Sequence, residues 1–205
     1  YASNGQADNY SFKYIPGTVT INQASFADLY FMTDVFILYD GTPKILDLRY
    51  KDLSPGPVVL EPTFVKNVLT DPHTDTGEYN VIITVEDTAG NYEFMTFSAI
   101  MTILPRDLTV RGASAVNRVY NATTSVALTG GSLYFGDELF EDPSVQLQPN
   151  TGIMENKNVG NNKAVTTAMS LTGSGARNYN LIQPDYITVD IQKTVITIQI
   201  DAVDR

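Results

Sequence analysis

The 205-residue sequence has no cysteine, no tryptophan and a single histidine, His73. Without cysteine, disulfide bonds, thiol nucleophiles and zinc–thiolate sites are excluded, so a hydrophobic core must hold the fold together. A histidine-based triad would have to be built around residues 71–75, and we interpret His73 as a loop or turn residue. The stretch Gly173-Ser174-Gly175 lacks the further glycine of a phosphate-binding loop, and a nucleophile elbow is also missing. We therefore predict no enzymatic activity, no catalytic residue and no cofactor.

Basic residues are few. The 13 Lys and Arg residues face 23 Asp and Glu residues, which leaves a formal net charge of −10. This charge disfavours attraction to nucleic acid or to an anionic membrane surface, so neither is expected as a partner. The sequence also lacks an apolar run of about 18 residues, the length expected of a membrane-spanning helix. We predict no membrane insertion in this segment.

The apolar residues alternate with polar ones and are often β-branched, a pattern typical of half-buried strands. Helix signals are scarce, and the best candidates are residues 24–32 and 137–142, each at most about two turns long. Turn signals rich in glycine and proline separate the alternating runs. They include 39–42, 54–57, 89–91, 130–131 and 172–175. The strands predicted in this way are residues 18–21, 79–85, 99–103, 107–110, 186–191 and 195–200.

Three short elements recur in the same order with a nearly constant spacing, which indicates internal repeats. They are a Tyr-Asp/Asn turn, an Asp/Asn-x-Gly element and an Asn-Tyr pair that precedes a strand. The turn occurs at Tyr39-Asp40-Gly41-Thr42 and Tyr120-Asn121-Ala122-Thr123; the second element at Asp75-Thr76-Gly77 and Asn158-Val159-Gly160; the pair at Asn9-Tyr10, Asn91-Tyr92 and Asn178-Tyr179.

This spacing predicts two full units, at residues 27–105 and 106–192, joined by a short linker. Residues 1–26 are the end of a preceding repeat or strands added to the first domain. We predict that residues 193–205 are the first strand of a following unit. Both terminal segments are expected to be paired, because open strand edges are a liability.

The motifs of the second unit resemble the YDG repeat domain of bacterial surface proteins, and those of the first unit are similar to the related MBG domain. The resemblance implies a repetitive, adhesin-like cell-surface context without catalysis. In the second unit Asn121-Ala122 replaces the family's Asp-Gly, and alanine disfavours the positive φ that glycine accepts.

Several site hypotheses remain open from the residues alone. Acidic residues at 137, 138, 141 and 142 could form a loose Ca²⁺ site, although we interpret them as a solvated acidic loop and predict no metal site. Aromatic residues could form a sugar-binding face. Lys44, Lys157 or Lys163 could form an isopeptide bond with an asparagine. Tyr79, two residues after Gly77, resembles the tyrosine corner of immunoglobulin-like sandwiches.

The sequence thus predicts an all-β chain of tandem immunoglobulin-like β-sandwich domains, with β-grasp-like units that contain one short helix as the alternative. The predicted role is a non-catalytic stalk in an extracellular, cell-surface adhesin of a bacterium, with neighbouring repeats as partners. The alternative role is recognition of a glycan or a host surface protein.

Overall fold

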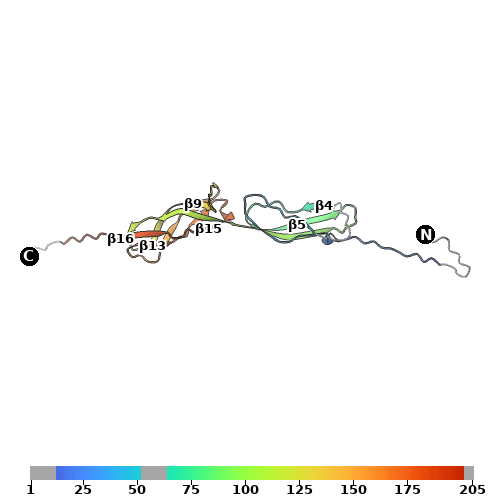
Figure 1. The fold of residues 1–205 in the computed structure, drawn as a ribbon, viewed down its shortest axis with the longest axis horizontal. Coiled ribbons are helices and arrows are strands. Elements are labelled where there is room, and N and C mark those ends of the chain that lie inside the picture. The colour runs from blue at the N-terminus through green and yellow to red at the C-terminus, as the bar shows by residue number, and fades with distance from the viewer. Residues whose placement is uncertain (1–12, 52–63, 201–205) are drawn as a thin grey trace, which may run out of the picture. The chain divides into compact units, whose positions relative to one another are not determined.

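The structure is a computed structural model that describes residues 13–51 and 64–200, and within these ranges it is all-β (Figure 1). Regular helix is limited there to two 3₁₀ turns, η1 (Phe26–Asp28) and η2 (Ala176–Asn178). The all-β prediction is confirmed. In the described part of the chain, no helix is long and apolar enough to cross a bilayer.

By their contacts the residues fall into two compact units. Among the described residues, unit 1 comprises 13–33, 47–51, 64–70 and 81–98, and unit 2 comprises 34–46, 71–80 and 99–200. The domain bounds predicted from the sequence, with breaks at 26, 105 and 192, stay a prediction.

One four-stranded sheet has the order β2-β6-β5-β4. Strand β2 is parallel to β6, and β4 is antiparallel to β5. Every second residue is buried from Val81 onward in β5 and from Ala99 onward in β6, as expected for strands with one face on a core. The strands are β2 (Val35–Leu38), β4 (Phe64–Val68), β5 (Gly77–Asp87) and β6 (Met95–Leu104), and a separate pair is formed by β1 (Tyr30–Phe31) and β3 (Arg49–Tyr50).

Unit 2 contains a larger sheet with the order β15-β7-β9-β12-β13-β16-β8, in which β10 also pairs with β9. Two of its pairings are parallel, β15 with β7 and β8 with β16. A small antiparallel pair, β11 with β14, lies outside this sheet. The bounds are β7 (Arg106–Ala115), β8 (Arg118–Val119), β9 (Ser125–Phe135), β10 (Glu138–Leu139), β11 (Gln146–Gln148), β12 (Thr151–Met154), β13 (Gly160–Thr166), β14 (Ser170–Thr172), β15 (Tyr179–Ile182) and β16 (Thr188–Gln192).

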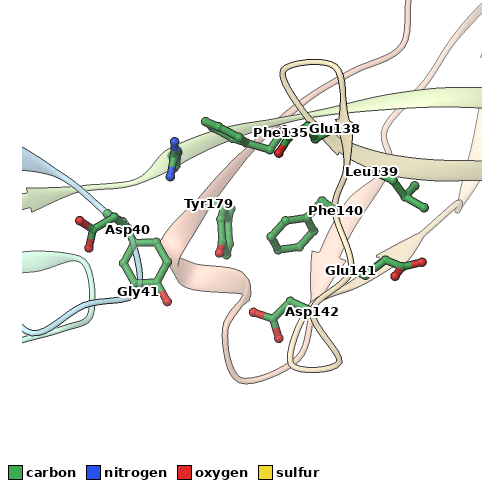
Figure 2. Close-up of a pocket in the computed structure, with 11 residues that line it drawn as sticks. Asp40, Gly41, Phe135, Glu138, Leu139, Phe140, Glu141, Asp142 and Tyr179 are labelled. Carbon is green, nitrogen blue, oxygen red and sulfur yellow. The ribbon is translucent and has the colours of Figure 1, made fainter.

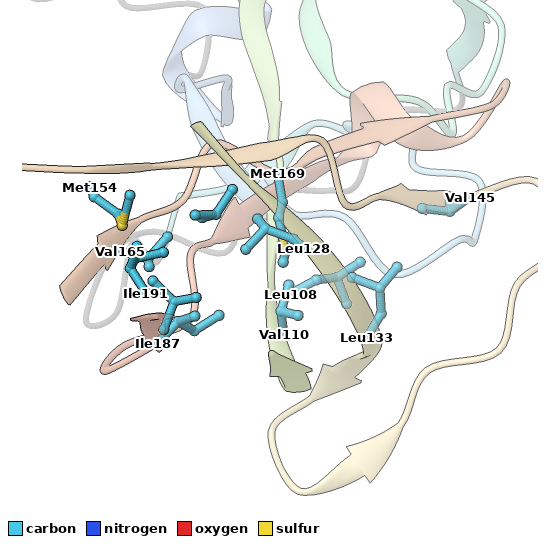
Figure 3. Packing of buried hydrophobic residues seen from close by; sticks show 12 residues of the cluster. Leu108, Val110, Leu128, Leu133, Val145, Met154, Val165, Met169, Ile187 and Ile191 are labelled. Carbon is cyan, nitrogen blue, oxygen red and sulfur yellow. The ribbon is translucent and has the colours of Figure 1, made fainter. Parts of the chain in front are cut away.

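A hydrophobic cluster fills unit 2, and its buried members all fall between residues 108 and 191 (Figure 3). Each fully buried aliphatic side chain contributes roughly 1.5–3 kcal/mol relative to an exposed one. The cluster consists of Leu108, Val110, Val126, Leu128, Leu133, Val145, Met154, Val165, Met169, Ile187, Val189 and Ile191.

Part of this sheet repeats the arrangement of the four-stranded sheet. The run β8-β16-β13-β12 has the same order as β2-β6-β5-β4, with a parallel first pair and an antiparallel last pair in both. Just after the first strand, the backbone N–H of Tyr39 donates to the Leu104 carbonyl at 2.9 Å, and that of Tyr120 donates to the Gln192 carbonyl at 2.8 Å. The two sets of four strands therefore match in strand order and also in the backbone hydrogen bond that follows the first strand of each.

The predicted strands at 79–85, 99–103 and 107–110 lie within β5, β6 and β7, and are confirmed. The predictions for 18–21 and 195–200 are wrong, since neither segment forms a strand and their apolar side chains are exposed. The predicted strand at 186–191 begins only at Thr188 because Tyr186 has φ +59°.

Both helix candidates are wrong as well. Residues 24–32 form only η1 and β1, which removes the helix on which the β-grasp alternative relied, and residues 137–142 contain β10. The expected turn at Gly130-Gly131 is an irregularity inside β9, where both glycines have positive φ. Asn9-Tyr10 and the turn at 54–57 lie outside the described residues.

Candidate functional site

A cavity of about 390 Å³ opens on unit 2, between the Tyr39 turn and the β9–β10 hairpin (Figure 2). The turn follows β2, and the hairpin brings aromatic and acidic side chains toward it. Figure 2 shows the ring of Phe140 directed toward Tyr179, with Glu141 and Asp142 next to it. The lining residues are Tyr39, Asp40, Gly41, Arg106, Phe135, Glu138, Leu139, Phe140, Glu141, Asp142 and Tyr179.

Tyr179, the first residue of β15, is the centre of the aromatic contacts in this cavity. Its ring meets Tyr39 edge-on at 5.3 Å between centroids and Phe140 at 5.0 Å. Such edge-to-face pairs add about 0.5–1.5 kcal/mol beyond the area that they bury. Burial raises the pKa of Tyr179, with further contributions from Tyr39 and Asp142, so its phenol stays protonated at neutral pH.

Two of the charged side chains that line the cavity already interact with neighbouring side chains. The Arg106 guanidinium lies 3.5 Å from the ring centroid of Phe135, a cation–π geometry. The Lys44 ammonium donates to Asp40 at 2.6 Å, and together with the Thr42 hydroxyl it holds the Asp40 pKa well below its usual range. The cavity thus offers aromatic faces with a mainly acidic rim.

The turn at Tyr39 is built by side chain to backbone hydrogen bonds. Asp40 Oδ1 accepts from the Thr42 backbone N–H at 2.9 Å and from the Thr42 hydroxyl at 2.7 Å, and Gly41 has φ +78°. These are the bonds that make Asp and Asn common in turns. Tyr39 and Asp40 therefore face the cavity from a fixed loop.

The second copy of the turn has the same geometry. Asn121 Oδ1 accepts from the backbone N–H and the hydroxyl of Thr123, at 3.1 Å and 2.8 Å, and Ala122 has φ +65°. The replacement of glycine by alanine put a positive-φ turn in doubt here, and the turn forms with positive φ nevertheless. Arg118 supports the strained turn, since its guanidinium donates to the side chain of Asn121 and to the Thr123 carbonyl.

A second polar cluster in unit 2 joins residues 71–80 to the start of β15. The side chain of Asn178, only 2 % exposed, donates to Asp75 Oδ1 at 2.9 Å and accepts from the Thr76 N–H at 2.9 Å. Arg177 forms an ion pair with Asp75 and accepts the Thr76 hydroxyl at its carbonyl at 3.0 Å. Asn178 and then Arg177 lower the pKa of Asp75. The sequence analysis noted both segments as repeat elements but did not connect them, because a tertiary contact leaves no local pattern.

His73 is held as a structural residue, in line with its predicted loop or turn role. Its ring stacks on Tyr79 at 3.7 Å between centroids, and its backbone pairs with Lys44 in an isolated bridge. The Tyr79 hydroxyl donates to the Asp75 carbonyl at 2.8 Å, which confirms that this tyrosine ties a turn to the backbone.

The remaining candidates are separated or engaged elsewhere. Of the four acidic residues that were candidates for a loose Ca²⁺ site, Asp137 forms an ion pair with Arg111 at 2.8 Å and Asp142 accepts from the Ser144 N–H. Among the described residues there is no group of three or more carboxylate or histidine side chains arranged to hold a metal. Lys163 donates to the Asn156 side-chain oxygen at 2.6 Å at an exposed position.

Comparison with protein families assigns the class of domain to part of this all-β chain. Residues 104–188 match the YDG domain, which confirms the YDG-type domain expected in the second unit. Neither curated proteins nor solved structures give a match.

Proposed function

We propose that this chain is a non-catalytic, stalk-forming region of a bacterial cell-surface adhesin, composed of tandem MBG-like and YDG-like domains with immunoglobulin-like architecture. The proposal places the chain outside the cell, with neighbouring repeats as its main partners. Its role is to space a binding region away from the surface and to resist tension, which requires folded cores rather than a reactive centre.

The observation that carries the proposal is the repeated sheet. The order β2-β6-β5-β4 recurs as β8-β16-β13-β12, and the same hydrogen-bonded turn follows the first strand of each. A YDG domain at 104–188 adds support. Repeated domains that each bury a core and contact mainly their neighbours are suited to extended arrays.

Stretching single molecules of the full chain by its two ends tests this proposal. A tandem array should give two discrete unfolding events, one per domain. A single event, or extension without a resolved force peak, would contradict the stalk assignment. Antibody labelling of intact producing cells tests the location separately, and labelling that appears only after lysis would contradict a surface protein.

The alternative function is direct recognition of a glycan or a host surface protein, and the cavity of unit 2 is the observation that favours it. Three of its four aromatic rings, those of Tyr39, Phe140 and Tyr179, contact one another and provide stacking faces, and the acidic rim provides hydrogen-bond acceptors. A glycan array probed with the full chain separates the two functions. A spacer binds no glycan selectively, whereas a binding module gives selective signals that Tyr179→Ala removes.

A further inference from the structure

The Tyr39 turn and the Asp75-Thr76 loop each contact the same short segment of unit 2. Tyr39 packs edge-on against Tyr179 at 5.3 Å, and Asp75 and Thr76 are hydrogen-bonded to Asn178. The segment they contact, residues 177–179, spans the end of η2 and the start of β15. We define it as the Arg-Asn-Tyr corner.

We infer that the Tyr39 turn and the Asp75-Thr76 loop together are a docking element, whose partner is the Arg-Asn-Tyr corner of the next copy of the domain. This inference rests on the proposed tandem architecture, since the docking element lies in the predicted domain 27–105 and the corner in the predicted domain 106–192. It gives the YDG signature a role that a turn alone would not require.

Burial and hydrogen-bond satisfaction support this role. Asn178 is one of two polar or charged residues among the buried residues described, and a buried amide without hydrogen-bond partners is destabilising. Its oxygen accepts from both the N–H and the hydroxyl of Thr76, and its amide nitrogen donates to Asp75. All these partners lie on the docking element, so the corner is complementary to that loop in particular.

The aromatic half of the contact points to the same partner. Tyr179 is the β15 residue paired with Arg106, the first residue of β7. The ring that receives Tyr39 is therefore fixed to the strand with which the YDG domain begins. Tyr39 in turn follows β2, whose register is fixed against β6. Both sides of the contact are thus held by parallel strand pairs.

Hydrogen exchange of the Thr76 amide in the full chain tests the inference. This N–H donates to Asn178, and the Asn178→Ala substitution should accelerate its exchange about tenfold, the factor that corresponds to 1.4 kcal/mol. The matched control is Asn91→Ala, because Asn91 precedes Tyr92 in the equivalent pair but lies in unit 1. It should leave Thr76 exchange unchanged.

A reciprocal double variant separates docking from a general loss of structure. The Asn178→Asp substitution alone places two carboxylates against each other, whereas Asp75→Asn with Asn178→Asp restores one donor and one acceptor across the contact. The double variant should recover most of the Thr76 protection lost in the single variant. Unchanged exchange in Asn178→Ala, or no recovery in the double variant, overturns the inference.

Spin labels give a second readout, and the absence of cysteine makes their placement simple. Labels at Leu38→Cys and Glu155→Cys report on exposed positions, both in unit 2. Their distance distribution should broaden when Tyr39→Ala and Asn178→Ala are combined. A distribution of unchanged width overturns docking, while two unfolding events under force would still support the stalk, so the two failures are distinguishable.

Discussion

The turn at Ala122 offers a direct test of how the repeated motif is stabilised. The two equivalent turns differ at the position with positive φ, which is Gly41 at φ +78° in the first turn and Ala122 at φ +65° in the second. The substitutions Ala122→Gly and Gly41→Ala exchange the two residues. We expect opposite effects of similar size.

The magnitude follows from two opposing contributions. An alanine in the left-handed region costs about 1–2 kcal/mol, and glycine removes that cost. Glycine also increases the entropy of the unfolded chain, which costs about 0.4–1 kcal/mol. Ala122→Gly should therefore stabilise the fold by a net of about 0.5–1 kcal/mol, and Gly41→Ala should destabilise it by the same amount. Steric contact does not complicate the second change, because the nearest atom to an added Cβ at Gly41 is the Tyr39 hydroxyl at 3.9 Å.

The assay for the turn at Ala122 is unfolding in urea, with hydrogen exchange at core amides of β16 as the measured signal. A local probe is needed because a chain with two units need not unfold in one transition. A shift of 0.5 kcal/mol corresponds to about 2 to 4 °C in a thermal midpoint for a domain of this size. Ala89→Gly serves as the control and is followed at the core amides of Ile83 and Val85 in its own unit, since Ala89 is exposed, lies in unit 1 and is not among the residues with positive φ. It should destabilise.

Stabilisation by Ala89→Gly as large as that by Ala122→Gly would refute the reasoning, since it would show a general effect of glycine. Destabilisation by Ala122→Gly would refute it as well. In that case the Arg118 bonds to the turn, rather than the backbone angle, would dominate its energy.

Three further outcomes are expected from single substitutions. Gly152→Ala should destabilise unit 2 by about 1–3 kcal/mol in urea unfolding, because the new Cβ would lie 2.3 Å from Val165 Cγ1. A smaller effect of the same substitution when it is made in the Val165→Ala variant would confirm the clash. Tyr79→Phe should lower the thermal midpoint through a loss of about 1 kcal/mol from the hydrogen bond to Asp75, whereas Tyr186→Phe, at a side chain 98 % exposed, should not. Backbone N–H groups, that of Ala89 first, lower the pKa of Asp87 in the folded protein below its unfolded value of 3.8. The ionised Asp87 therefore stabilises the fold above about pH 4, and this contribution is lost as the pH falls through the folded pKa. In an acid titration, the Asp87→Asn variant should lose less stability than the unchanged protein.

Local sequence patterns predicted the long strands correctly. The ends of strands and the pairing of short segments depend on tertiary contacts, which such patterns do not contain. Residues 79–85 and 99–103 were found as strands because their alternation matches one buried and one exposed face. The same alternation at 195–200 misled, since this segment forms no strand in the structure and its apolar side chains are exposed. Gly130-Gly131 gives the sequence signal of a turn, yet the chain continues through it within β9.

The candidate site was only partly readable from the sequence. The Tyr39 turn was found because Asp, Gly and Thr are turn residues in a fixed order, and Tyr79 because its spacing from Asp75 is local. The contact between Asp75 and Asn178 was missed, since it joins residues far apart in the chain and depends on the register of β15 with β7. The cavity was missed for the same reason.

The parallel pairing of β7 with β15 and of β8 with β16 affects how a pulled chain responds. In each pair the earlier strand is drawn back toward its start while the later strand is drawn forward toward its end. The hydrogen bonds between them are then loaded in shear, and several must break together instead of one after another. Strand pairs loaded in shear resist force more strongly than pairs whose hydrogen bonds break in turn, so the parallel topology bears on resistance to force separately from thermodynamic stability.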